Sequence, residues 1–123
     1  MEFLLDSVIL IDHFNGYQQA TQFILKHQQH THISVISRAE VLTGFRGVAL
    51  ARAKQLLDLF PLLSMDKEIA DLAAQLRQTV GWKLPDAIQA AIAKSHGLKL
   101  VTRNSKDFSP KKHKFVLIPY NIQ

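Results

Sequence analysis

The alternation of short apolar, β-rich runs with longer helix-like segments is the feature that most constrains how this chain can fold. Runs of strand character lie at residues 2–5, 32–36, 61–64, 98–102 and 115–118. The segments between them predict helices at 7–14, 17–29, 38–45, 48–59, 66–80 and 85–96. Strands that alternate with helices predict an α/β fold, here one α/β/α domain in which helices flank a central, mainly parallel sheet of about five strands.

Length and composition are typical of a single globular domain and exclude several other classes of protein. A chain of 123 residues suits one domain over 1–123, and 47% hydrophobic with 20% charged residues is a globular balance. No apolar run approaches the roughly 18 residues of a membrane helix, and the apolar N-terminus lacks the basic start of a signal peptide. The absence of cysteine excludes disulfides and thiolate metal sites, and a cytoplasmic location is expected. The net charge of +5 favours a polyanionic partner such as nucleic acid.

Acidic and polar side chains recur at the ends of the predicted strands and the starts of the helices. Asp6 closes the first strand, and Glu40 lies near the start of the helix after the second. Asn104 and Asp107 follow the fourth strand, and Asp86 opens the helix that leads into it. Since ligands of open parallel sheets bind beyond the carboxyl ends of the strands, we expect these side chains to share one edge.

Most of these residues also have a purely structural explanation. Ser37 and Glu40 have the spacing of a capping box, in which the glutamate reaches back to the serine N–H. Asp86 suits the positive end of a helix dipole, an effect of about 0.3 to 1 kcal/mol. Asn104 and Asp107 are common turn formers. Both explanations stay open for these positions.

Asp66 and Asp6 differ in how easily a structural role explains them. Asp66 precedes a helical stripe and is expected to be a plain N-cap. Asp6 closes an apolar strand and is therefore expected to be partly buried, which is costly unless a cation or hydrogen-bond donors meet it. Two carboxylates about 5 Å apart repel by roughly 3 kcal/mol, whereas a cap gains only about 1 kcal/mol. Converging acids would therefore need a divalent cation, and oxygen ligands suit Mg²⁺ or Mn²⁺.

Four segments, in their order and spacing, carry a family resemblance. They are LLDS (4–7), SRAEVLTG (37–44), LPDAIQAAIA (84–93) and LVTRNSKDF (100–108). Together they resemble the PIN-domain nucleases, and more narrowly the VapC-type toxins of bacterial toxin–antitoxin pairs. The resemblance covers nearly the whole chain and implies a metal-dependent endoribonuclease that cleaves RNA phosphodiester bonds. It also implies a homodimer held inactive by an antitoxin protein, whose tail occupies the acidic groove.

The resemblance also implies roles for individual residues. Asp6, Glu40 and Asp86 match the three family acids that hold Mg²⁺ (or Mn²⁺). The fourth position falls at Asp107, with Asn104 as a neighbouring polar contact. In this interpretation Asp6 and Asp86 bind the metal directly, while Glu40 and Asp107 bind a second metal or orient the attacking water.

The chain departs from the family pattern directly after the first aspartate. The family usually has a small polar residue there, followed by Asn or Ser, whereas this chain has Ser7 and then Val8. Ser7 keeps a hydroxyl near the metal, but Val8 removes a polar contact. A second hypothesis therefore stays open, a catalytically weakened PIN-like module that only binds RNA or a partner protein.

Basic residues beside the acidic motifs are candidates for RNA binding. Lys106, Lys111 and Lys112 follow the fourth strand, and Arg38 and Arg103 flank two of the motifs. All five could contact RNA phosphates. Alternatively, the lysines are a solvated loop and the arginines pair with acids.

Two further features favour structural roles. His27 and His30 are three residues apart, as zinc ligands on a helix can be, but no nearby cysteine or carboxylate completes the set, so solvated histidines are expected. Trp82 is expected to pack under a loop rather than to stack on a base.

Overall fold

The computed structural model describes residues 2–122. Its strands are β1 (Phe3–Leu5), β2 (Thr31–Ser34), β3 (Leu62–Leu63), β4 (Lys99–Val101) and β5 (Val116–Leu117). Its helices are α1 (Ser7–Phe14), α2 (Gln18–His27), the short 3-10 helix η1 (Gln28–His30), α3 (Val35–Thr43), α4 (Gly47–Leu57), α5 (Lys67–Val80) and α6 (Leu84–Ser95). Across residues 2–122, no helix is both long enough and apolar enough to span a bilayer.

The sheet has five strands in the order β3-β2-β1-β4-β5, and every pairing is parallel. The predicted α/β fold with a parallel sheet is therefore confirmed. The chain adds strands outward from β1 to β3 on one side, then crosses over to add β4 and β5 on the other. The strand order thus reverses between β1 and β4, and the crevice beyond their carboxyl ends is where such sheets bind ligands.

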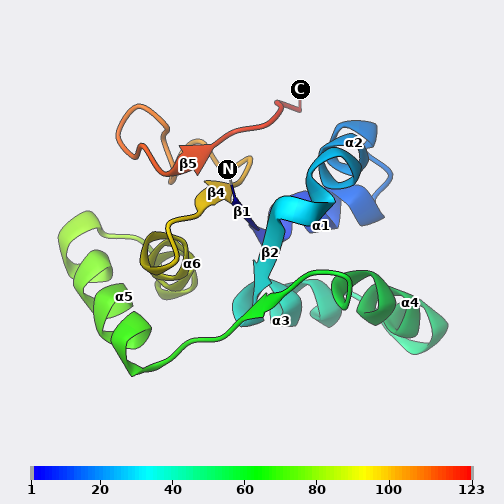
Figure 1. Ribbon diagram of the computed structural model, residues 1–123, viewed down its shortest axis with the longest axis horizontal. Coiled ribbons are helices and arrows are strands. Elements are labelled where there is room, and N and C mark those ends of the chain that lie inside the picture. Colours follow the sequence, from blue (N-terminus) through cyan, green and yellow to red (C-terminus); the bar gives the residue numbers. More distant parts are fainter. Residues whose placement is uncertain (1, 123) are drawn as a thin grey trace.

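Side chains alternate along β1 and connect the sheet to two separate layers of helices. Leu4 packs in a core cluster with α5 and α6, whereas Phe3 and Leu5 pack on the opposite face with residues of α1 and α2. Figure 1 shows α5 and α6 on one side of the sheet and α1 and α2 on the other. Both faces of the central strands are covered, which explains why these strands are apolar throughout.

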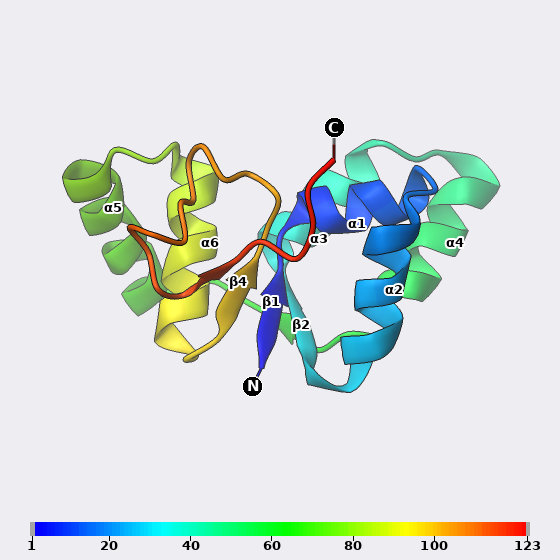
Figure 2. The same ribbon diagram turned by 90° about the horizontal axis from the view of Figure 1, so that it is seen from above.

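Helix α6 is buried along most of its length, between the sheet and α5. Residues 87–93 are all buried, and four of these seven are alanines, whose small side chains permit close packing. The helix is followed by Gly97, whose left-handed φ of 65° lets the chain turn back into β4. Figure 2 shows α6 beginning on the side where β1 and β4 end, so its first turn faces the crevice.

The junction of β2 and α3 differs from the prediction. The strand ends at Ser34 and α3 begins at Val35, whereas strand was expected to continue to residue 36 and helix to begin at 38. The Ser34 hydroxyl accepts a hydrogen bond from the Ser37 N–H at 3.1 Å, so Ser34 is the N-cap. The capping-box interpretation of Ser37 and Glu40 is therefore wrong, because the cap lies three residues earlier and overrides the strand propensity of Val35 and the residue after it.

Asp66, in contrast, has the predicted role. Its side chain accepts a hydrogen bond from the Ile69 N–H at 2.8 Å and caps α5. The cap accounts for this aspartate, which does not line the pocket described below.

Candidate active site

Asp6 lies at the centre of the crevice, directly after β1. The residue is buried, with a relative exposure of 7%. The carboxylate accepts hydrogen bonds from the Ser7 N–H at 2.9 Å, the Thr102 hydroxyl at 2.8 Å and the Gln89 side-chain amide at 3.3 Å. The predicted burial is confirmed, and donors from α1, α6 and the end of β4 stabilise this carboxylate.

Gln89 belongs to a buried polar network that fixes the position of Asp6. It is 1% exposed, and its amide also donates to the Ser37 hydroxyl at 2.7 Å and accepts from the Ser34 hydroxyl. Ser37 in turn donates to the Leu5 carbonyl at 3.2 Å. Gln89 was not among the residues predicted from the sequence, although a polar residue inside the apolar run 87–93 is a signal for such a buried partner.

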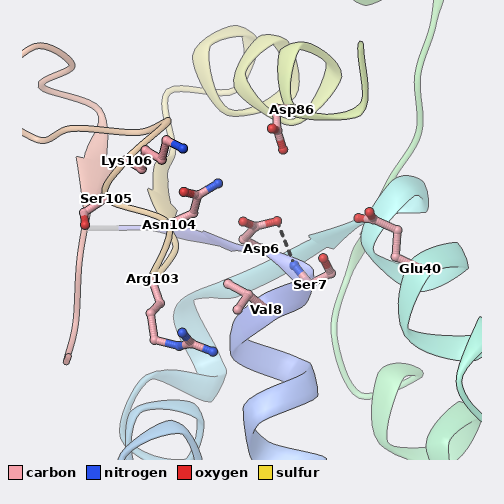
Figure 3. A pocket seen from close by; sticks show the side chains of 9 residues that line it. All are labelled: Asp6, Ser7, Val8, Glu40, Asp86, Arg103, Asn104, Ser105 and Lys106. Atoms are coloured by element: carbon pink, nitrogen blue, oxygen red, sulfur yellow. Dashed lines mark hydrogen bonds between the residues drawn. The ribbon is translucent and has the colours of Figure 1, made fainter. Parts of the chain in front are cut away.

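Three carboxylates line one pocket of about 480 Å³ beyond the carboxyl ends of the strands. They are Asp6, Glu40 from α3 and Asp86 from the first turn of α6. In Figure 3, Glu40 and Asp86 point toward Asp6 from different sides. Residues more than 30 positions apart are therefore brought together, as their places at strand ends and helix starts predicted.

The pKa of Asp86 shows that its charged form is disfavoured. Burial, followed by the nearby charges of Asp6, Asp107 and Glu40, raises this pKa to about 6, against a smaller opposing effect of Lys83. A helix start favours a negative charge and would lower the pKa. The helix dipole alone therefore does not account for Asp86, since burial and like charges outweigh it.

Glu40 responds to the same surroundings. Burial raises the pKa of its carboxyl group, the Ser7 hydroxyl lowers it, and the charge of Asp6 raises it. The residue is exposed as a whole, but Figure 3 shows its carboxylate directed into the pocket. Repulsion between the carboxylates of the pocket thus contributes to the raised pKa values of both Glu40 and Asp86.

Asn104 and Asp107 lie on the loop after β4. The Asn104 amide donates to the Asp107 carboxylate at 2.9 Å, and the Asp107 N–H donates to the Asn104 side-chain oxygen at 3.3 Å, as expected of turn formers. Asn104 lines the acidic pocket, whereas Asp107 lines a neighbouring groove. The charge of Asp107 still contributes to the raised pKa of Asp86.

Arg103 lines the pocket, but its guanidinium group is bound elsewhere. It donates to both oxygens of Asp12, at 2.7 and 2.9 Å, and Asp12 is only 2% exposed. The Tyr120 hydroxyl donates to the same carboxylate at 2.9 Å. Asp12 was also not predicted from the sequence, although it follows the buried Ile9 by three residues and therefore falls on the buried face of α1.

The other predicted RNA-binding residues differ in their surroundings. Arg38 forms an ion pair with Asp58 at 2.9 Å, so both arginines pair with acids outside the pocket. Lys106 lines both the acidic pocket and the neighbouring groove. Lys112 lines that groove, and Lys111 is exposed on the same loop.

The remaining sequence features have structural roles. Trp82 is buried, and its indole N–H donates to the Asp107 carbonyl at 2.7 Å, which confirms that it packs under the loop. His30 bonds to Glu2 at 2.9 Å, so a carboxylate does lie near this histidine, contrary to expectation. His27 packs against the Phe3 ring. Within residues 2–122, however, no three His, Asp or Glu side chains lie close enough together to ligate one metal ion as they stand.

The donor set of the acidic pocket nevertheless fits a hard divalent cation. Its carboxylates offer the oxygen ligands that Mg²⁺ and Mn²⁺ prefer. Burial and, to a smaller extent, neighbouring carboxylates raise the pKa values of Asp86 and Glu40, and a bound cation would favour the charged forms of both groups. Asp6, Glu40 and Asp86 are the residues that could hold the ion.

Comparison with known proteins places this geometry in a family. The sequence model of the PIN domain matches residues 3–113. A chain of a toxin–antitoxin complex from Klebsiella pneumoniae is similar at 37% identity, covers 98% of this chain and 100% of its own length, and has a TM-score of 0.92. A chain of FitAcB from Neisseria gonorrhoeae shares the fold at 23% identity, with 95% and 97% covered and a TM-score of 0.80. No curated protein sequence matched significantly. The predicted resemblance is confirmed, and the chain belongs to the PIN domain family.

Proposed function

We propose that this PIN domain is a metal-dependent endoribonuclease and the toxin of a toxin–antitoxin pair. The observation that carries the proposal is the meeting of Asp6, Glu40 and Asp86 in one pocket at the point where the strand order reverses. The 37% identity to a chain of a toxin–antitoxin complex supports the biological role. The net charge of +5 suits an RNA substrate.

Asp6, Glu40 and Asp86 would hold Mg²⁺ or Mn²⁺, with Asp107 as the fourth acid and Asn104 as its polar neighbour. A bound divalent ion supplies an activated water and neutralises charge on the phosphoryl group. Thr102 and Gln89 hold the Asp6 carboxylate in place. Glu40, whose pKa is raised, accepts a proton from the attacking water or orients it.

The proposed partners of the toxin are an antitoxin protein and a second copy of the chain. The similar chain from Klebsiella pneumoniae comes from a toxin–antitoxin complex. The pocket is lined with carboxylates, so we propose that a basic segment of the antitoxin occupies it and competes with the metal. The homodimer is proposed on the family resemblance alone.

One observation keeps a second function in view. Val8 lines the acidic pocket at a position where the family pattern usually has a polar side chain. A valine there donates no hydrogen bond to a water or to a phosphate oxygen. The second candidate is therefore a PIN-like module that binds RNA or a partner protein without cleaving it.

Cleavage of single-stranded RNA by the purified protein separates the two candidates. Wild type, Asp86→Asn and Glu40→Gln would be compared with EDTA, Mg²⁺ and Mn²⁺. If the protein is a nuclease, wild type should cleave RNA only when metal is present. The cleavage rate should fall at least about 100-fold in both variants, since each variant removes a group that acts on the transition state. RNA binding without metal-dependent cleavage by wild type would establish the binding module instead.

A further inference from the structure

A second groove, of about 430 Å³, adjoins the acidic pocket. It lies between the segment before α6 and the loop after β4, and Lys106 lines both cavities. Lys83 also lines it and precedes Asp86 by only three residues. An RNA strand that lies across the acidic pocket can therefore continue directly into this groove.

Lysine side chains dominate the charge of the groove. Lys83, Lys106 and Lys112 line it against one carboxylate, that of Asp107. Among residues 2–122 none of these three lysines is in an ion pair, and all three are exposed. Asp107 already accepts a hydrogen bond from Asn104. The ammonium groups are therefore free to bind an anion.

The walls of the groove are held rigidly. On one side, the Arg77 guanidinium donates to the Trp82 carbonyl at 2.8 Å. On the other, the Trp82 indole N–H holds the Asp107 carbonyl at 2.7 Å, and the following residue, Phe108, is fully buried. A preorganised cationic groove loses less entropy on binding than a mobile loop does.

The groove suits a phosphate better than a base. Bases that bind without pairing stack on exposed aromatic rings. The Trp82 ring is only 5% exposed and packs against Phe108 and His113, so it offers no platform for stacking. Lysines, in contrast, bind phosphate as point charges without reading sequence.

We propose that this groove binds a backbone phosphate of single-stranded RNA next to the phosphate that is cleaved, with Lys83 and Lys112 as its contacts. The inference rests on the proposed function, and it adds Lys83 to the RNA-binding residues. It gives the substrate a direction, from the acidic pocket past Lys106 into the groove. Substrate recognition there is independent of sequence.

The test measures binding of a single-stranded RNA oligonucleotide to the Asp86→Asn protein in EDTA at several salt concentrations. In this background the RNA stays intact, and loss of Lys83 does not alter the charge of an aspartate at position 86. Lys83→Gln and Lys112→Gln are introduced together. Lys54→Gln with Lys67→Gln, on exposed surfaces of α4 and α5, is the control with the same loss of charge.

The groove variant should weaken binding and reduce the magnitude of the slope of log K against log salt concentration by about 0.7, because the groove holds one phosphate and each neutralised phosphate of a single strand contributes about 0.7. The control variant should keep the slope. An unchanged slope in the groove variant, or an equal decrease in the control, overturns the inference. The groove would then be a candidate site for an acidic peptide and not for RNA. The nuclease proposal is tested separately: it fails if the wild-type protein does not cleave RNA in the presence of metal.

Discussion

At the scale of single residues, the decisive observation is that Asp86 occupies a position where its charge is unfavourable. A carboxylate that only stabilised the helix start would have a lowered pKa. Burial and the charges of Asp6, Asp107 and Glu40 instead raise the pKa of Asp86 to about 6. The apo protein is therefore less stable because of this charge, which is typical of functional sites.

This raised pKa predicts how stability depends on pH. The folded state binds a proton at Asp86 more tightly than the unfolded state, whose pKa is near 3.8. The free energy of unfolding should therefore decrease as the pH rises from about 4 to 6, by about 1 to 2 kcal/mol from this residue alone, because solvent screens a half-buried group. Urea unfolding in EDTA across this range measures the effect.

Asp86→Asn is the matched control for that pH dependence, since asparagine is nearly isosteric and does not titrate. The decrease assigned to position 86 should be absent in this variant. If both proteins lose the same stability between pH 4 and 6, the raised pKa of Asp86 is refuted.

At the scale of elements, long-range hydrogen bonds tie the loop after β4 to α1. Arg103 on the loop and Tyr120 near the C-terminus both donate to Asp12, which is buried on α1. Burial raises the pKa of Asp12, but the hydrogen bonds from Arg103 and Tyr120 and the charge of Arg103 together lower it by more, so the net pKa is lowered. Arg103 directly precedes Asn104, so these bonds also position the pocket wall.

Two arginine–aspartate pairs within residues 2–122 allow a matched comparison. Asp12→Asn should lower the free energy of unfolding by about 3 kcal/mol at neutral pH, because it leaves Arg103 without its buried partner. Asp58→Asn breaks the pair with Arg38, in which Asp58 is 65% exposed, and should cost at most about 1 kcal/mol. Chemical denaturation of both variants measures the difference, and equal losses would contradict a stabilising role for Asp12.

The elements themselves could largely be predicted from the sequence. All five strands and the six long helices lie close to their predicted positions, because hydrophobic periodicity and the alternation of segments carry that information. The junction after β2 was wrong by three residues, since the strand propensity of Val35 conflicts with the capping serine before it. Hydrogen bonds decide such local conflicts, and hydrophobic periodicity carries no information about them.

At the scale of the whole molecule, topology explains both what the sequence predicted of the site and what it did not. The convergence of Asp6, Glu40 and Asp86 follows from their places at strand ends and helix starts, which a parallel sheet brings to one edge. The buried partners Gln89 and Asp12 depend on which side chains meet across elements. That information lies in the three-dimensional packing and not in the spacing along the chain.

Asp6, Glu40 and Asp86 repel one another in the apo protein, and we propose that a divalent ion relieves this repulsion. The most direct test is the free energy of unfolding of wild type and Asp86→Asn at pH 7.5, measured against Mg²⁺ or Mn²⁺ concentration. Without metal the variant should be more stable, by about 1 to 3 kcal/mol. Metal at about 100 times its dissociation constant should stabilise wild type by about 2.7 kcal/mol and the variant much less. The difference in the free energy of unfolding between the two proteins should therefore decrease or change sign. Identical responses of the two proteins to metal, or a variant that is less stable without it, would contradict the account.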